Sequence, residues 1–411
     1  MNFKLALAAA AVVGLAGTAQ AADLAKKAPA AADYVKVCDA YGAGFFYIPG
    51  SDTCLKIGGY VRVELRTGDH NDPFASARYT GPKPGVGLGY DRGDNAINTR
   101  VRTQLTFDAR TNTEMGLLRS FIELWVQNQS ADTGTVSVNL RNAFVQFAGL
   151  TAGRAASNFT FIEGGYNINN IEPDSSDRRV NQLAYTFAFG NGISATLGIE
   201  DPTTSDAALG WGSTNIKTPD VVGNLAISQA WGRAQLSAAY TQNRDDVTYV
   251  SSHTKGGWAV GAGVEVNLPM LGAGDKIFVQ GAYTKGAVDY LLNNTAAYYD
   301  AGATPKAKNI GLARNWDGSD ASKAWVIGAG LNHNFSKQVE ANLGASYLKY
   351  DDASDATRDY KSWVVGGDLR WKPVTGLTMA VALDYRTVDY NVVGLSTANQ
   401  WMGTLRVQRN F

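Results

Sequence analysis

Apolar and polar residues alternate along most of this chain, from Leu55 to its last residue. Between Leu55 and Thr67, leucine, isoleucine and valine fall on odd positions, whereas lysine, tyrosine, arginine and glutamate fall on even positions. The same period of two recurs in residues 258–268, 363–371 and 401–411. A period of two gives a β-strand with one apolar and one polar face. The chain is therefore predicted to form sheet whose two faces meet different surroundings.

This alternation predicts about sixteen strands. Most of them approach the roughly 10 residues that a tilted strand needs to cross a membrane. Alternation is weakest around residues 142–147, within the fourth predicted strand. The predicted strands are 55–67, 96–110, 116–128, 135–148, 151–159, 180–189, 192–201, 221–230, 233–243, 256–268, 275–287, 324–335, 338–350, 361–372, 376–388 and 399–411.

The composition excludes several other classes of protein. Mean hydropathy is −0.18 and 18% of the 411 residues are charged. A polytopic helical membrane protein would be far more apolar, because each helical span needs roughly 20 mostly apolar residues. Lys+Arg and Asp+Glu number 37 each, so the basic excess of a nucleic-acid-binding protein is missing. Length alone allows two or three soluble domains or one large closed sheet.

The N-terminus has the three-part layout of a secretory signal peptide. A basic start ends at Lys4, residues 5–17 are apolar, and a small-residue Ala-Gln-Ala site ends at Ala21. We predict that residues 1–21 are removed on export. A retained anchor is the alternative, but the apolar run is short for a membrane span. No later segment approaches the length of a helical span, so membrane insertion would be by strands.

The connections between predicted strands alternate in length. Residues 190–191, 231–232 and 336–337 form tight turns, whereas residues 67–95 and 288–323 form long connections rich in Gly, Asp, Asn and Thr. Short turns at one rim and long loops at the other are the layout of an outer-membrane barrel. A soluble sandwich has no reason to sort its loops in this way.

Tryptophan positions support the membrane barrel. Four strands that follow a long connection begin with Trp on the apolar face and end eight to ten residues later with a large apolar residue. At about 3.3 Å per residue and a tilt of about 40°, these ends lie roughly 20–25 Å apart, as two aromatic girdles do. Aromatic filling of a soluble core is the alternative. The predicted girdle residues are Trp258, Trp325, Trp363, Trp371, Trp401, Phe335 and Phe411.

Two cysteines, Cys38 and Cys54, lie 16 positions apart. In an exported chain, two nearby cysteines indicate a disulfide. A metal site is the competing interpretation. It lacks support because the three histidines lie far away and tetrahedral sites need four ligands.

Three segments resemble one protein family. The segment YVKVCDAYGAGFFYIPGSDTCLKIGGYVRVE resembles the N-terminal signature of the general porins of alphaproteobacteria, the rhizobial-type porin family. LTAGRAASNFTF resembles that family's approach to its inward loop, and VQRNF ends in the phenylalanine typical of outer-membrane barrels. The resemblance covers essentially the whole mature chain. It implies a sixteen-stranded, trimeric, water-filled channel whose third long loop folds into the pore.

The resemblance also assigns particular residues. It places a Cys38–Cys54 disulfide ahead of the first strand and makes residues 160–179 the constriction loop. The acids that this loop carries are Glu163, Glu172, Asp174 and Asp177.

Arginines on the polar face near the strand midpoints predict a basic wall in the pore. They are Arg62, Arg102, Arg141 and Arg406. The first, second and last strands are adjacent once the barrel closes, and arginine is easily hydrated in a water-filled lumen. Loop acids opposite this wall would create a transverse field at the constriction.

An alternative leaves the arginines without a role in selectivity. In it they form ion pairs with acids on neighbouring strands, and the loop acids lie in solvent. The acids available for this pairing are Glu64, Asp108 and Glu123.

Motifs for enzymatic chemistry are missing from the sequence. It contains no G-x-S-x-G elbow, no H-E-x-x-H and no phosphate-binding Walker loop. No cofactor, metal or catalytic residue is therefore predicted.

We predict an all-β transmembrane barrel (55–411) preceded by a periplasmic segment (22–54). It would act as an outer-membrane general diffusion porin for ions and small hydrophilic solutes. The expected partners are two further copies in a homotrimer, outer-membrane lipid and lipopolysaccharide, and the barrel-assembly machinery acting on Phe411, but no nucleic acid. Two alternatives remain: a substrate-selective channel, for which lumen aromatics are few (Tyr60, Phe278, Tyr350), and a barrel-embedded enzyme.

Overall fold

The computed structural model describes most of the chain. It covers residues 36–68, 97–130, 135–168, 175–202, 218–244, 254–291, 316–317, 320–353, 356, 359–391 and 397–411. The predicted signal peptide, 1–21, and residues 22–35 of the predicted periplasmic segment lie outside these ranges. No helix among the described residues is long and apolar enough to span a membrane.

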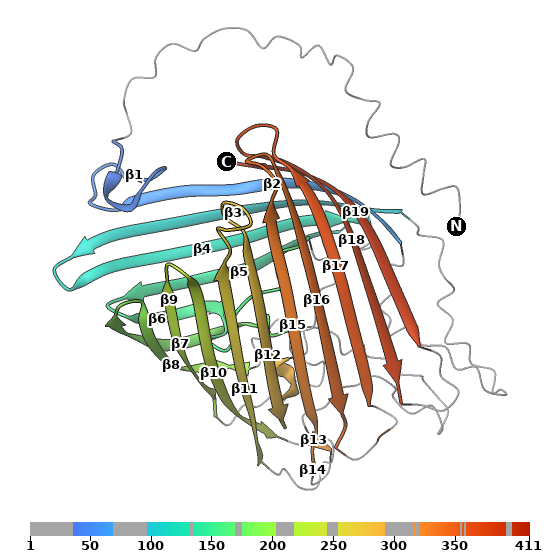
Figure 1. Ribbon diagram of the computed structural model, residues 1–411. Helices are drawn as coiled ribbons and strands as arrows, with labels where there is room; N and C mark the ends of the chain where they lie inside the picture. Colours follow the sequence, from blue (N-terminus) through green and yellow to red (C-terminus); the bar gives the residue numbers. More distant parts are fainter. Residues whose placement is uncertain are drawn as a thin grey trace, which may run out of the picture.

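Sixteen long antiparallel strands form one closed barrel (Figure 1). Each pairs with its neighbours in sequence, and β19 pairs with β2 to close the sheet. The barrel strands are β2 (Cys54–Gly68), β3 (Ile97–Thr113), β4 (Gly116–Gln129), β5 (Val136–Phe147), β6 (Leu150–Ala156), β7 (Arg179–Gly190), β8 (Ile193–Asp201), β9 (Asp220–Gln229), β10 (Gly232–Arg244), β11 (Thr254–Asn267), β12 (Lys276–Lys285), β15 (Lys323–Asn334), β16 (Val339–Asp351), β17 (Tyr360–Trp371), β18 (Leu377–Tyr390) and β19 (Ala398–Asn410).

The two rims of the barrel differ as predicted. Tight turns such as 148–149 and 230–231 join strands at one end, which we call the short-turn rim. The strand pairs β2–β3, β8–β9 and β12–β15 are joined by long connections at the other end, the long-loop rim.

Five short elements of the described chain lie outside the barrel wall. The 3-10 helix η1 and the strand β1 precede β2, and the 3-10 helix η4 and the hairpin β13–β14 fall within the connection predicted at 288–323. Their bounds are η1 Asp39–Tyr41, β1 Phe46–Tyr47, η4 Val288–Tyr290, β13 Trp316–Asp317 and β14 Asp320–Ala321.

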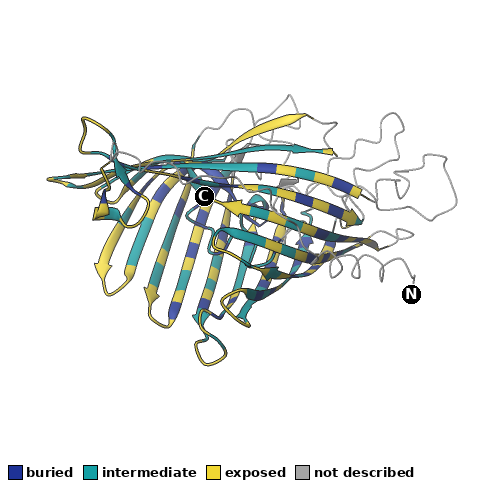
Figure 2. Ribbon diagram, turned by 90° about the horizontal axis from the view of Figure 1, so that it is seen from above, coloured by how far each residue is buried: buried dark blue, intermediate teal, exposed yellow. Residues whose placement is uncertain are grey.

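Exposed residues alternate with buried or half-buried residues along many of the strands (Figure 2). On β2, the aliphatic side chains of Val61 and Val63 are exposed on the outside, whereas Glu64 and Arg66 are buried on the inside. A closed barrel with an aliphatic exterior and a charged interior is suited to lipid outside and water inside.

Predicted and observed strand ends differ by at most 3 residues. One of the largest differences is β6, which ends at Ala156 although alternation extends it to residue 159. The carboxylate of Glu200, which is fully buried, causes the early end. It accepts hydrogen bonds from Ser157 Oγ at 2.8 and 3.0 Å and from the Asn158 amide at 2.9 Å. These bonds draw the chain away from the wall and start the loop that follows.

A β-bulge explains the weak alternation of the fourth predicted strand. Asn142 lies opposite Glu123 and Leu140 lies opposite Leu124, so that Arg141 is the extra residue. One extra residue reverses the parity of the strand. Outward side chains therefore change from even to odd positions along β5.

The last residue completes the barrel wall. The Phe411 amide donates to Gly59 O at 3.1 Å, and the Gly59 amide donates to Phe411 O at 3.2 Å. A Cβ at position 59 would lie 2.0 Å from Gln104 O, and the backbone there has φ +153. Only glycine therefore allows β2 to approach β3 this closely next to the contact with Phe411.

The predicted disulfide is present. Cys38 and Cys54 are bonded, with their Cα atoms 6.0 Å apart, so the metal-site alternative does not apply. Both are buried together with Phe45. The Arg110 guanidinium of β3 lies 5.0 Å from the Phe45 ring, which holds residues 36–53 against the short-turn rim.

Candidate pore constriction

The segment 157–168, between β6 and β7, runs through the barrel interior; we call it the inward loop. Gln280 of β12 accepts from the Ile162 amide at 3.1 Å and donates to Ile162 O at 3.2 Å. Ser237 of β10 donates to Phe159 O at 2.9 Å. The loop is therefore fastened along the inner face of the wall opposite β2 and β3.

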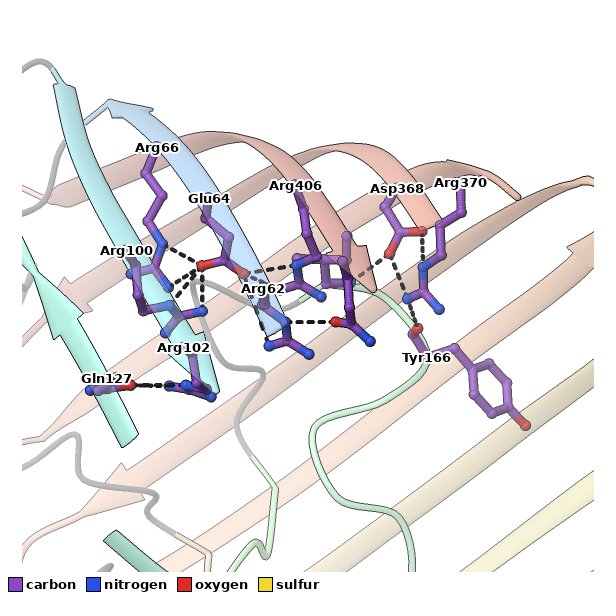
Figure 3. A network of polar contacts seen from close by, with 12 residues as sticks. Arg62, Glu64, Arg66, Arg100, Arg102, Gln127, Tyr166, Asp368, Arg370 and Arg406 are labelled. Atoms are coloured by element: carbon purple, nitrogen blue, oxygen red, sulfur yellow. Dashed lines mark hydrogen bonds and ion pairs between the residues drawn. The ribbon is translucent and has the colours of Figure 1, made fainter. Parts of the chain in front are cut away.

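The tip of the inward loop is bound to β17 and β18 (Figure 3). Arg370 Nη2 donates to Tyr166 O at 2.6 Å, and the Ile168 amide donates to Asp368 Oδ2 at 2.5 Å. Tyr166 Oη donates to Glu265 at 2.7 Å, and burial followed by this hydrogen bond raises the Tyr166 pKa, so the phenol stays neutral. The loop thus spans the lumen and ends beside the strands that precede β19.

A buried ion cluster holds the other end of the connection. Arg178 Nη2 lies 3.6 Å from Asp289 and 4.0 Å from Asp220, with its guanidinium 4.0 Å from the Tyr290 ring. Burial by itself would lower the Arg178 pKa, but Asp289, Tyr290 and Asp220 together raise it above its ordinary value. The η4 segment is therefore tied to the start of β7 inside the barrel.

Five arginines gather on the lumen face of β19, β2 and β3 (Figure 3). Four of them lie within 4.0 Å of one buried carboxylate, Glu64, and the fifth, Arg102, donates to Gln127. We call this group the arginine cluster; its members are Arg62, Arg66, Arg100, Arg102 and Arg406. The sequence prediction named three of them and missed Arg66 and Arg100, which share the same parity and could have been found from it.

Glu64 pairs with most of the arginine cluster. Its carboxylate lies 2.6 Å from Arg100 Nη2 and from Arg406 Nη2, 2.8 Å from Arg66 and 4.0 Å from Arg62. The pairing proposed in the alternative interpretation therefore exists for Glu64. One carboxylate cannot balance five guanidinium groups, so the cluster keeps an excess of positive charge.

The other two acids of that alternative pair elsewhere. Asp108 accepts from Arg110 and Arg119 at 2.8–3.0 Å near the short-turn rim. Glu123 accepts from Trp125 Nε1 at 2.9 Å and from Asn142 at 2.6 Å.

The described loop acids lie beside Arg141 and Arg179. Glu163 and Asp177 each lie 3.7 Å from Arg141, and both accept hydrogen bonds from Arg179. Neither has an ion pair with the arginine cluster among the described residues. Glu172 and Asp174 lie outside the described residues.

Trp125 connects Arg141 to the arginine cluster. Its ring lies 4.1 Å from the Arg102 guanidinium and 4.4 Å from the Arg141 guanidinium. The predicted basic wall thus continues from β19 to β5, but its last member faces two carboxylates of the loop.

All seven predicted girdle residues lie on the outer surface and are exposed. The prediction missed four tyrosines that lie directly opposite tryptophans on the neighbouring strand. The pairs are Tyr240–Trp258, Tyr283–Trp325, Tyr347–Trp363 and Tyr385–Trp401. These tyrosines occupy outward positions near the ends of their strands, so parity could have revealed them.

Aromatic side chains in the lumen are more numerous than the three that the sequence indicated. Phe121, Trp125 and Phe144 also point inward from β4 and β5. Arginine guanidinium groups lie over these rings at 4.1–5.5 Å. Phe278 is covered by Tyr166 of the inward loop. Phe278 is buried, whereas Phe121, Trp125 and Phe144 remain partly exposed beneath the guanidinium groups.

Comparisons with known proteins agree on one family. The family described as "Porin subfamily" matches residues 23–407. Porin Omp2b of Brucella suis biovar 1 and of Brucella abortus is 30% identical over 434 aligned residues, covering 100% of each chain.

Solved structures share the fold at low sequence identity. The outer membrane channel DcaP of Acinetobacter baumannii has a TM-score of 0.66 at 15% identity, covering 89% of this chain and 99% of that one. The anion-selective porin from Comamonas acidovorans has a TM-score of 0.53 at 12% identity, covering 87% and 100%.

A closed barrel with an apolar exterior, a charged lumen and an internal loop is the architecture of an outer-membrane channel. The chain belongs to the porin family, which confirms the resemblance drawn from its sequence. It is an outer-membrane general diffusion porin and not an enzyme. The short-turn rim accordingly faces the periplasm and the long-loop rim faces the exterior.

Proposed function

We propose that ions and small hydrophilic solutes cross the barrel between the inward loop and the arginine cluster. The observation that carries this proposal is the attachment of the loop tip to Asp368 and Arg370, which fixes the loop across the lumen. The water-filled passage then narrows between this loop and the wall of β2 and β3. No cofactor takes part, because passive diffusion needs only a hydrated path.

The charges that line the narrow passage between the inward loop and the arginine cluster favour anions. Glu163 and Asp177 are balanced by Arg141 and Arg179, whereas the arginine cluster holds five positive charges against Glu64. Side-chain charges that line a narrow aqueous section set its ion preference. We therefore propose an anion preference set by the β2–β3 wall.

Single-channel recording in a planar bilayer tests the channel and its preference. In Glu163→Gln/Asp177→Asn, Arg141 and Arg179 lose their carboxylate partners, and the reversal potential in a salt gradient should move further toward anions. The shift should be larger near 0.01 M than near 1 M salt, because the screening length falls from about 30 Å to about 3 Å. Glu123→Gln is the control, because the hydrogen-bond donors to this acid, Trp125 and Asn142, are uncharged side chains and not arginines of the narrow section.

Two results would count against this proposal. The absence of any current from the correctly folded protein would refute the channel. An unchanged reversal potential in the double variant would show that these acids do not influence the narrow section.

We propose that three copies assemble through the outer face of β3–β6. The Tyr–Trp pairs of the extracellular girdle lie on β10–β19, and no aromatic side chain occupies the same height on the described residues of β2–β8.

Arg154 lies on the outer parity of β6, opposite Ala143. An arginine facing lipid near the midplane costs about 2–4 kcal/mol, which a subunit contact avoids.

The pairing of β5 points to the same face. Among the described strands, β5 pairs with β6 only at 143–147, so residues 136–142 have a strand partner on one side only. Arg154 Nε donates to one of these backbone groups, Leu140 O, at 2.9 Å, and backbone groups that lack a partner are not tolerated against lipid. A neighbouring subunit on this face would keep lipid away from that edge.

We further propose that residues 1–21 form a signal peptide removed on export and that residues 22–54 form a periplasmic segment. The position of the disulfide at the short-turn rim supports the second assignment. Lipopolysaccharide around the extracellular girdle and recognition of Phe411 by the assembly machinery complete the proposed set of partners.

A further inference from the structure

Two rows of side chains cross the lumen wall at adjacent levels. Cross-strand pairing aligns each row over β19, β2, β3 and β4. We call them the glutamate row and the glutamine row. The glutamate row is Arg406, Glu64, Arg100 and Gln129, and the glutamine row is Gln408, Arg62, Arg102 and Gln127.

The glutamine row contains two arginines and no acid. Arg62 and Arg102 lie directly opposite each other on β2 and β3. Like charges in opposite positions destabilise a sheet. In the glutamate row, by contrast, the acid stands between two arginines and pairs with both.

Neutral side chains hold both guanidinium groups of the glutamine row in place. Arg62 Nε donates to Gln408 Oε1 at 2.7 Å, and Arg102 donates through Nε and Nη2 to Gln127 Oε1 at 2.9 and 2.6 Å. The guanidinium carbons also lie 4.4 Å from the Tyr60 ring and 4.1 Å from the Trp125 ring. The two groups are therefore oriented in advance without being neutralised.

The carboxylate of Glu64 does not neutralise the charges of Arg62 and Arg102. It lies 4.0 Å from Arg62 Nη1, and its oxygens already accept from Arg66, Arg100 and Arg406 at 2.7–3.2 Å. Other cations on the lumen wall are matched more closely. Arg370, for example, pairs with both Asp368 and Glu340, and Lys372 pairs with Glu340. In the described part of the wall, Arg102 thus has no carboxylate within 4.0 Å, and Arg62 has only the 4.0 Å contact with Glu64, which three other arginines already occupy.

We propose that Arg62 and Arg102 form a binding site for an oxyanion within the pore, in the class of inorganic phosphate and the phosphate or carboxylate groups of small solutes. Planar guanidinium forks bind two oxygens of one anion, which a spherical chloride ion does not offer. This inference rests on the proposed passage between the inward loop and the arginine cluster. Binding must remain weak for the anion to leave and conduction to continue.

The first test uses the wild-type trimer in a planar bilayer with potassium chloride. Inorganic phosphate replaces chloride at constant ionic strength and pH. We expect the single-channel current to fall with phosphate and to saturate, because a bound oxyanion occupies the site. A current that changes only in proportion to bulk conductivity would overturn the site, while the presence of a chloride current would leave the channel itself established.

The second test distinguishes binding by the two guanidinium forks from attraction by positive charge alone. Arg62→Lys/Arg102→Lys keeps both charges but removes the forks. We expect phosphate to act about tenfold more weakly in this variant, which corresponds to about 1.4 kcal/mol, because lysine cannot donate two parallel hydrogen bonds to one anion. Equal phosphate sensitivity of the lysine variant and the wild type would overturn the proposal.

A pair of single variants provides the matched control. Arg102→Gln and Arg119→Gln each remove one positive charge from the lumen wall, but Arg119 is paired with Asp108, which keeps Arg110 as a partner. We expect Arg102→Gln to weaken the phosphate effect and Arg119→Gln to preserve it. Equal losses in the two variants would show that overall charge, and not this pair, binds phosphate.

Discussion

At the scale of single residues, parity decides whether a side chain meets lipid or the lumen. Val381 is 49% exposed on the outer face of β18, whereas its neighbour Ala382 is 3% exposed inside. Parity alone suggests that a charge at position 382 is harmless. The structure shows that Ala382 lies opposite Asp368, which binds the tip of the inward loop. A large side chain at position 382 would therefore meet Asp368 and the loop, and not open water.

Val381→Arg should destabilise the barrel by about 2–4 kcal/mol, because it brings a charge to the lipid-facing midplane. Thr106→Arg on β3 is the lumen control, since position 106 is opposite Glu123 and a cation there gains a partner. Urea titration of both variants in lipid vesicles measures the difference. Equal midpoints for the two variants would contradict the assignment of faces.

At the scale of elements, one buried acid ends β6 and a few hydrogen bonds hold the loop that follows. Glu200 binds Ser157 and Asn158, and Asp368 receives the Ile168 amide together with Asn342. Hydrogen bonds to charged groups are each worth about 1.5–3 kcal/mol. The loop position therefore depends on a small number of strong contacts and not on an extended interface.

Asp368→Asn should loosen the tip of the inward loop. The amide is a weaker acceptor than the carboxylate, and Arg370 loses an ion pair at 2.8 Å. We expect noisier single-channel currents and a larger mean conductance than in the wild type. Asn342→Ala is the control, because it removes a neutral partner of Asp368 without touching the loop. Identical current noise in the wild type and Asp368→Asn would show that the loop is held by its other contacts.

At the scale of the whole molecule, the outer surface is divided into two unlike sectors. The Tyr–Trp pairs cover β10–β19, whereas β3–β6 carry Arg154 and the incompletely paired part of β5. A single barrel surrounded by lipid would have one girdle around its whole circumference. The asymmetry is the physical basis of the proposed trimer.

Val138→Arg should disrupt assembly without unfolding the barrel. Val138 is 68% exposed on β5 within the proposed subunit face. Arginine there would bury an unpaired charge in the trimer but remain hydrated in a detergent-solubilised monomer. Unheated gel electrophoresis and light scattering should therefore show folded monomers. Trimers as abundant and as heat-resistant as the wild type would place the contact on other strands.

The sequence by itself determined the strand number, the two faces of each strand, the disulfide and the family. These properties follow from local periodicity, from two cysteines and from short motifs, none of which depends on distant pairing. The tertiary structure decided which charges meet. Barrel closure brings Arg406 to Glu64, cross-strand register sets Arg62 opposite Arg102, and the bulge at Arg141 turns that side chain toward the loop acids. Register and bulges arise from contacts between strands far apart in the chain, so alternation along a single strand does not reveal them.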